Sequence, residues 1–161
     1  MAGREGGDVL RHSLLDRLAQ QGGNRRGDLR IGFDELLQAV RRDIEWLLNT
    51  KRIGSYDLES LPETQESIIN YGLPDFSHYS GSSPADCQRI CGSIVQTLRR
   101  FEPRLAPHTI RVEHVPPAER IGTQSRFRIH ALLHVDPVKE PVVFDTEIEM
   151  DTGSVQVRTD Q

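Results

Sequence analysis

Two neighbouring stretches near the C-terminus alternate between apolar and charged residues: SRFRIHALLHV, from Ser125 to Val135, and VVFDTEIEM, from Val142 to Met150. A period of two is typical of β-strands that bury one face. The residues expected to point inward are Phe127, Ile129, Ala131, Leu133, Val135, Val142, Phe144, Thr146, Ile148 and Met150. The outer face is basic in the first stretch and acidic in the second. We therefore predict an antiparallel hairpin, connected through residues 136–141, whose register is set by opposite charges.

Shorter strands are predicted on either side of this hairpin, from Thr109 to Val115 and from Ser154 to Thr159. Upstream, the apolar period changes to 3.6, which predicts helices from Val9 to Ala19, from Asp34 to Thr50 and from Pro84 to Phe101, and a short one from Glu63 to Asn70. Ser83 is a typical N-cap for the helix that begins with Pro84. The pattern predicts an α+β fold, with N-terminal helices packed on one face of a small antiparallel β-meander.

The length and composition of the chain indicate one domain. Its 161 residues are enough for a single hydrophobic core, which we expect to span residues 9–161 after a disordered N-terminus, residues 1–8. A formal net charge of -4 argues against nucleic acid and anionic membranes as partners. No apolar run approaches the length of a membrane span. We therefore expect a cytoplasmic protein.

Candidate catalytic and metal-binding residues do not form a recognisable site in the sequence. Asp145, Glu147 and Glu149 form the solvated face of a predicted strand, where neighbouring cations would lower their pKa values. His130 and His134 would stand about 13 Å apart on a strand, too far apart to share a metal ion. Cys87 and Cys91 are expected to be buried, reduced thiols. We expect no catalytic, metal or cofactor site.

Two features suggest a surface for partner proteins. Glu102 places a negative charge at the negative end of a helix, where it needs a cation, and Arg104 follows directly after Pro103. This cation could form an internal clasp with Glu102, or the segment could face a partner. If it faces a partner, Glu102→Ala and Arg104→Ala should leave the fold largely intact and weaken assembly. Trp46 lies outside the apolar stripe of its helix, so either a loop or a partner covers it.

Three segments carry a resemblance to a known family: SLLDRL (13–18), SIINYGLPD (67–75) and FEPRL (101–105). In this order they resemble the baseplate wedge subunit of type VI secretion systems, TssE, which is similar to the phage tail proteins called gene 25-like lysozymes. The resemblance implies a structural subunit and no enzyme. It implies that Glu102, Pro103 and Arg104 hold the wedge proteins TssF and TssG.

The same resemblance implies a place at the base of a contractile sheath. TssK and the sheath proteins TssB and TssC are then further partners, within a baseplate docked at the membrane. An outer strand of a sheet can accept a strand from another chain. We expect the sheath to begin on the last strand, through Val155, Gln156 and Val157.

Two other functions remain open at this point. A regulatory or anti-adaptor module could use the same fold, because a fold does not determine a function. A stress regulon around the gene would favour that module, whereas sheath and wedge genes would favour the baseplate. A peptidoglycan hydrolase would need two carboxylates about 5 to 9.5 Å apart in a sugar cleft, and would clear cell-wall substrate.

Overall fold

The computed structural model describes residues 33–52, 67–116, 124–135 and 138–159. In chain order the elements are α2 (Phe33–Asn49), the 3₁₀ turn η2 (Ile68–Asn70), α4 (Pro84–Phe101), β1 (Arg111–Val115), β2 (Gln124–Val135), β3 (Val138–Glu149) and β4 (Val155–Thr159). The predicted helix from Val9 to Ala19 and the predicted disordered segment 1–8 lie outside the described residues. Of the short helix predicted from Glu63 to Asn70, the described part is only η2.

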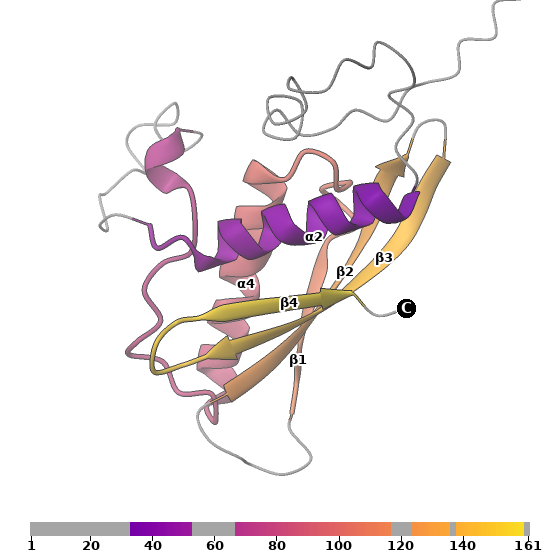
Figure 1. The fold of residues 1–161 in the computed structure, drawn as a ribbon. Helices are drawn as coiled ribbons and strands as arrows, with labels where there is room; N and C mark the ends of the chain where they lie inside the picture. The colour runs from indigo at the N-terminus through magenta and orange to yellow at the C-terminus, as the bar shows by residue number, and fades with distance from the viewer. Residues whose placement is uncertain (1–32, 53–66, 117–123, 136–137, 160–161) are drawn as a thin grey trace, which may run out of the picture.

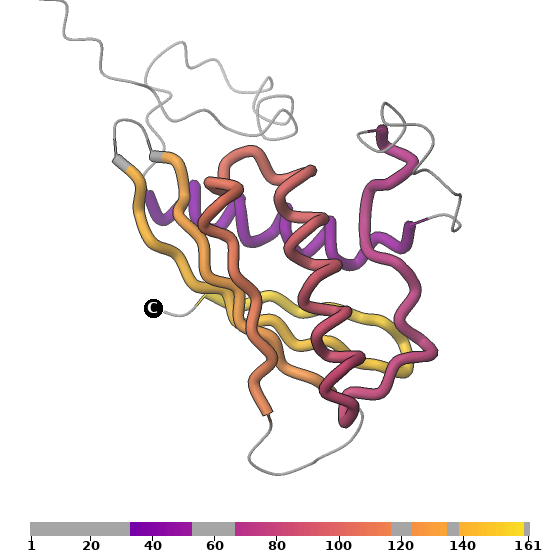
Figure 2. The backbone as a smooth tube through the Cα atoms, turned by 180° about the vertical axis from the view of Figure 1, so that it is seen from behind, coloured from indigo at the N-terminus to yellow at the C-terminus, as the bar shows by residue number. Residues whose placement is uncertain are grey.

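The four strands form an antiparallel meander in the order β1-β2-β3-β4, and the two helices pack against one of its faces (Figure 1). The predicted α+β fold is thereby confirmed. β1 and β4 are the outer strands, as predicted. α4 lies over the part of the sheet that includes β1, and α2 runs beside β4 and crosses α4, as the view from behind also shows (Figure 2).

One core fills the space between the helices and the sheet. The apolar stripe of α2 and the inner face of α4 meet the inward residues of the strands. The residues with no exposed surface are Val40, Ile44, Ile90, Ile94, Leu98, Leu105, Ile129, Leu133 and Phe144. The inward residues predicted from Val142 to Met150 are all buried, which confirms the predicted orientation of that strand. Phe33, the first residue of α2, is 37% exposed and lies outside the core.

The charge alternation sets the register of the central hairpin. Arg126 pairs with Glu147 and Arg128 with Asp145 across β2 and β3, and these pairs form ion pairs of 3.0 and 2.7 Å. The predicted pairing of the basic and acidic faces is thus confirmed. Both pairs lie on the outer face of the sheet, away from the helices.

The predicted connection through residue 141 is wrong, because β3 already begins at Val138 and pairs with Val135. Pro141 led to the error, since proline removes a ladder donor and normally ends a strand. Its partner Leu132 directs its carbonyl and amide away from β3, toward Ala106 N and Thr109 Oγ1. The missing N–H of Pro141 therefore faces the far side of β3, where the described part of β4 reaches only to the pairing with Phe144.

The ends of α4 follow from its sequence. Ser83 caps the helix, and its hydroxyl accepts a hydrogen bond from Asp86 N. At the other end, Glu102 leaves the helical region with φ -116° and ψ 83°. The following proline disfavours helical geometry for the residue before it, so the helix ends at Phe101.

Candidate functional site

Glu102 and Arg104 form a closed ion pair within the chain. Arg104 donates from Nε to Glu102 Oε1 and from Nη2 to Glu102 Oε2, both at 2.6 Å, and the main-chain N–H of Arg104 also donates to Oε1 at 3.2 Å. Glu102 is 3% exposed, whereas the intervening Pro103 is exposed. The cation that Glu102 requires is therefore supplied internally, by the planar fork of the arginine.

A second carboxylate, which the sequence did not reveal, joins this pair. Asp43 of α2 accepts a hydrogen bond of 2.8 Å from Arg104 Nη2, across 61 positions of the chain. Asp43 also accepts two hydrogen bonds from its neighbour Arg42, at 3.1 and 3.2 Å. We call Asp43, Glu102 and Arg104 the clasp. The clasp ties α2 to the end of α4, and no local pattern could identify Asp43 because the contact depends on how the helices cross.

The clasp is held in a partly buried, strongly charged environment. Burial by itself would lower the pKa of Arg104, but hydrogen bonds and charges from Glu102, and then from Asp43, outweigh burial and raise the pKa above its ordinary value. Arg104 therefore stays charged at any physiological pH. Burial, followed by the negative charges of Asp43 and Glu102, raises the pKa of Tyr71, which keeps this phenol protonated.

The structure brings together two segments that carried the family resemblance. The ring of Tyr71 packs edge-on against Phe101 with centroids 5.3 Å apart. The chain around Tyr71 is held by Leu73, whose N–H donates to Thr50 O and whose carbonyl accepts from Arg52 N. The residues after the clasp are held as well, because Arg104 O accepts from His134 N of β2. The clasp is therefore supported from both helices and from the sheet.

Trp46 is 53% exposed, so in the described part of the chain no loop covers it as one alternative predicted. The guanidinium of Arg42 lies 5.3 Å from its ring centre, in a cation–π arrangement. Because Arg42 also binds Asp43, a series of contacts links Trp46 to the clasp. The other candidate residues, on β4, are not part of it.

Of the three candidate residues on β4, the side chains of Val155 and Val157 are each 2% exposed, and that of Gln156 is exposed. The main-chain groups of Val155 and Val157 face α2. Val155 O accepts from Asn49 Nδ2, Val155 N donates to Asn49 Oδ1, and Val157 O accepts from Arg41 Nη1. Since successive residues alternate, Gln156 directs its main chain toward β3. Any partner contact of the two valines would thus have to use their main chain.

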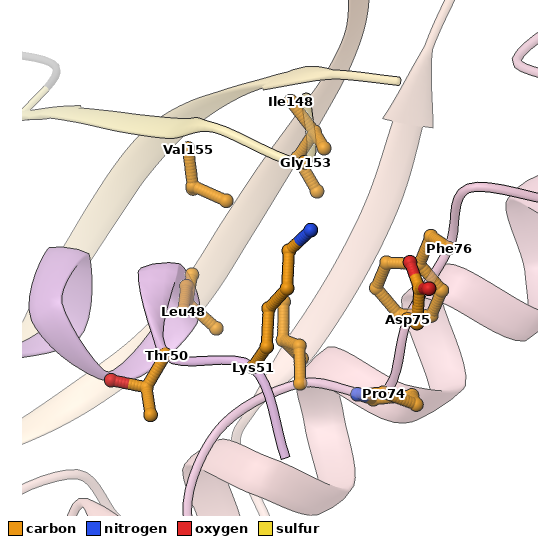
Figure 3. A pocket seen from close by; sticks show the side chains of 10 residues that line it. Leu48, Thr50, Lys51, Pro74, Asp75, Phe76, Ile148, Gly153 and Val155 are labelled. Carbon is orange, nitrogen blue, oxygen red and sulfur yellow. The ribbon is translucent and has the colours of Figure 1, made fainter. Parts of the chain in front are cut away.

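Two hollows in the described part of the chain are lined by carboxylates. A small one between the end of α2 and the β3–β4 turn has a volume of about 20 Å³, roughly room for one water molecule. Lys51 extends into it toward Gly153, and Asp75 is the single carboxylate in its lining (Figure 3). This hollow cannot hold the two carboxylates that a glycosidase requires.

The second hollow lies on the outer face of the sheet and contains Asp145 and Glu147. Glu147 is bound by Arg126 at 3.0 Å. A hydrogen bond from Arg128 lowers the pKa of Asp145 below its ordinary value. A general acid needs the opposite shift, because it must hold its proton at the working pH. The charged face of the sheet is therefore poorly suited to acid catalysis.

We expect Arg128→Leu to raise the pKa of Asp145 toward its ordinary value, because the main hydrogen bond that favours the carboxylate is lost. In the parent protein this bond stabilises the fold at neutral pH, and its contribution is lost as the pH falls through the lowered pKa. Carboxyl-detected NMR titration measures the shift. Arg89→Leu, on α4, is the control. An unchanged Asp145 titration would show that solvent, and not Arg128, sets its protonation.

The described residues offer no cluster of three or more metal-ligating side chains. Cys87 is buried, Cys91 is partly buried, and both are free thiols. Burial raises the pKa of Cys91 to about 11, which leaves it unreactive near neutral pH. None of the helices in the described ranges has the length and apolar character of a membrane span.

Comparison with known proteins identifies one family. Residues 34–138 match the family model of the baseplate wedge protein gp25. The match covers more than half of the chain and includes both long helices, the clasp and the first two strands. No curated protein and no solved structure matches the chain significantly.

Proposed function

The chain belongs to the baseplate wedge protein gp25 family, and from this membership we propose that it is the TssE subunit of a type VI secretion baseplate. The family is structural and not, in general, catalytic. The observation that carries the proposal is the family match, together with the three segments that resemble TssE. In this role the protein is cytoplasmic, within a baseplate docked at the membrane.

We place the contact with the wedge proteins TssF and TssG on the surface formed by Trp46, Pro103 and the outer edge of Arg104. Trp46 and Pro103 are exposed, and tryptophan and arginine dominate the energetics of protein interfaces. Glu102 is too buried to meet a partner directly. It acts as a positioning residue, which holds the guanidinium of Arg104 in one orientation.

The remaining partners of the proposal are TssK and the sheath proteins TssB and TssC. The support is the open meander, whose outer strands β1 and β4 each have one side that no strand of the sheet pairs with. A sheath strand that adds to β4 would have to displace Asn49 and Arg41 of α2 from the main chain of Val155 and Val157, with Gln156 pointing outward. Proline at Val157 tests this contact, whereas proline at Gln156 would break the pairing of β4 with β3.

Co-purification with TssF and TssG tests the proposed function. The parent chain should retain both proteins, and Trp46→Ala should weaken binding by about 30-fold or more, the loss typical of a hot-spot residue. Circular dichroism and thermal unfolding should change little, because Trp46 is 53% exposed. Ile68→Ala is the matched control, since Ile68 is an exposed apolar residue that belongs to η2 and not to α2.

Two results would contradict these assignments separately. If the parent chain retains neither wedge protein and sheaths form in normal number without it, the proposed function is wrong. If the parent binds and Trp46→Ala binds equally well, the function stands and the wedge contact lies elsewhere.

A further inference from the structure

The outer side of β4 is occupied by side chains of α2. In most sheets, an outer strand presents unpaired N–H and C=O groups that can accept a strand from another chain. Here the groups of Val155 and Val157 that point away from β3 face α2, which runs beside the strand (Figure 1). The outer side of β4 is therefore not an ordinary open edge.

Asn49, the last residue of α2, pairs with Val155 as a neighbouring strand would. Its Nδ2 donates to Val155 O at 2.7 Å, and its Oδ1 accepts from Val155 N at 2.9 Å. In a hydrogen-bonded pair of an antiparallel ladder, one residue likewise satisfies both groups of its partner. A carboxamide has the same donor and acceptor groups as a peptide unit, so it can replace one residue of a fifth strand.

Arg41 closes the next position of the same edge. Its Nη1 donates to Val157 O at 2.9 Å. The guanidinium is fixed within α2 by Glu45 at 2.9 Å and by Gln38 at 3.1 Å. Asn49 is anchored in the same way, because its Nδ2 also donates to Glu45 O at 2.8 Å. Both contacts are therefore held by the helix.

We propose that Asn49 and Arg41 make α2 a closing element for β4, which keeps the edge from pairing with β4 of a second copy of the chain. The strand is self-complementary when two copies pair antiparallel about Val157. In that register Arg158 of one copy faces Gln156 of the other, so no like charges oppose each other. Without the two contacts, the paired strands would continue the sheet across two molecules. This inference concerns the free subunit and does not depend on the proposed function.

Two measurements on the full chain test the closing element. In Asn49→Ala, the Val155 amide loses its acceptor, and its hydrogen exchange by NMR should become faster by about tenfold or more. In a variant with both Asn49→Ala and Arg41→Ala, which frees the outward groups of Val155 and Val157, sedimentation velocity should show a shift toward dimer relative to the parent at equal concentration. Adding Val157→Pro should remove the dimer, because it removes an N–H that faces out from β4. Gln88→Ala, which removes an exposed carboxamide from α4, should change neither measurement.

The results separate the possible explanations. If the Val155 amide of Asn49→Ala exchanges rapidly but the double variant with Arg41→Ala sediments like the parent, the edge is open without pairing and the proposal is overturned. Unchanged Val155 exchange overturns it too. If Asn49→Ala does not fold, Asn49→Asp, again with Arg41→Ala, takes its place in the sedimentation measurement, since aspartate loses the donor to Val155 O. Val155 exchange is not measured in this variant, because aspartate keeps the acceptor for Val155 N. Unfolding of both variants would show that the contact is needed for the fold itself, which also overturns the proposal.

Discussion

Replacing Arg104 by alanine should lower the free energy of unfolding by about 3 kcal/mol or more, the loss typical when one member of a buried ion pair is removed. Two carboxylates would lose their shared cation. Glu102, which is 3% exposed, would lose its cation, and no other cation contacts it in the described part of the chain. Asp43 would still bind Arg42. This differs from the expectation drawn from sequence, in which the variant keeps the fold largely intact and loses assembly alone.

Urea unfolding followed by circular dichroism measures the effect. Glu102→Gln and Asp43→Asn are the matched variants, because each keeps its shape and removes one negative charge. We expect both to be less destabilising than Arg104→Ala, since Arg104 would keep its other carboxylate in each. If Arg104→Ala unfolds at the parental urea concentration and fails to bind TssF and TssG, the clasp serves the partner and contributes nothing to the fold.

Gly72→Ala should destabilise the protein by several kcal/mol. Gly72 has φ +100°, a region that side chains make unfavourable by about 1–3 kcal/mol. A Cβ at this position would also lie 2.1 Å from Thr50 O. That carbonyl accepts the hydrogen bond from Leu73 N and cannot move without breaking the contact between α2 and the segment before α4. The unfavourable backbone conformation and the clash with Thr50 O both destabilise the contact between Thr50 and the segment around Gly72.

Thermal unfolding compares this variant with Gly92→Ala. Gly92 is an exposed residue within α4, and a Cβ there would meet no atom within 4 Å. Alanine is favoured over glycine in a helix by roughly 0.5–1 kcal/mol, so Gly92→Ala should raise the unfolding temperature. Both variants replace glycine by alanine, and we expect opposite effects on the unfolding temperature. A Gly72→Ala variant as stable as the parent would show that the segment around Thr50 can rearrange at little cost.

Local patterns were enough to predict most of the secondary structure. The alternation after Ser125 predicted both central strands and the pairing of a basic face with an acidic one, because the faces of a strand are determined by neighbours two positions apart. Ser83 and Pro84 predicted the start of α4 in the same way. The predicted connection at Pro141 was wrong because the side toward which the proline nitrogen points depends on the register of β2 and β3, which is a property of the sheet.

The contacts of the candidate site were decided by the tertiary structure. The sequence indicated that Glu102 needs a cation, and Arg104 was the candidate two positions away. That Asp43 shares this cation, and that Asn49 closes β4, follows from the crossing of α2 over the end of α4 and its position beside the sheet. These contacts join residues 61 and 106 positions apart. Periodicity records which face of an element is buried, but it carries no information on which distant element packs there, because that is decided by how the whole core fills space.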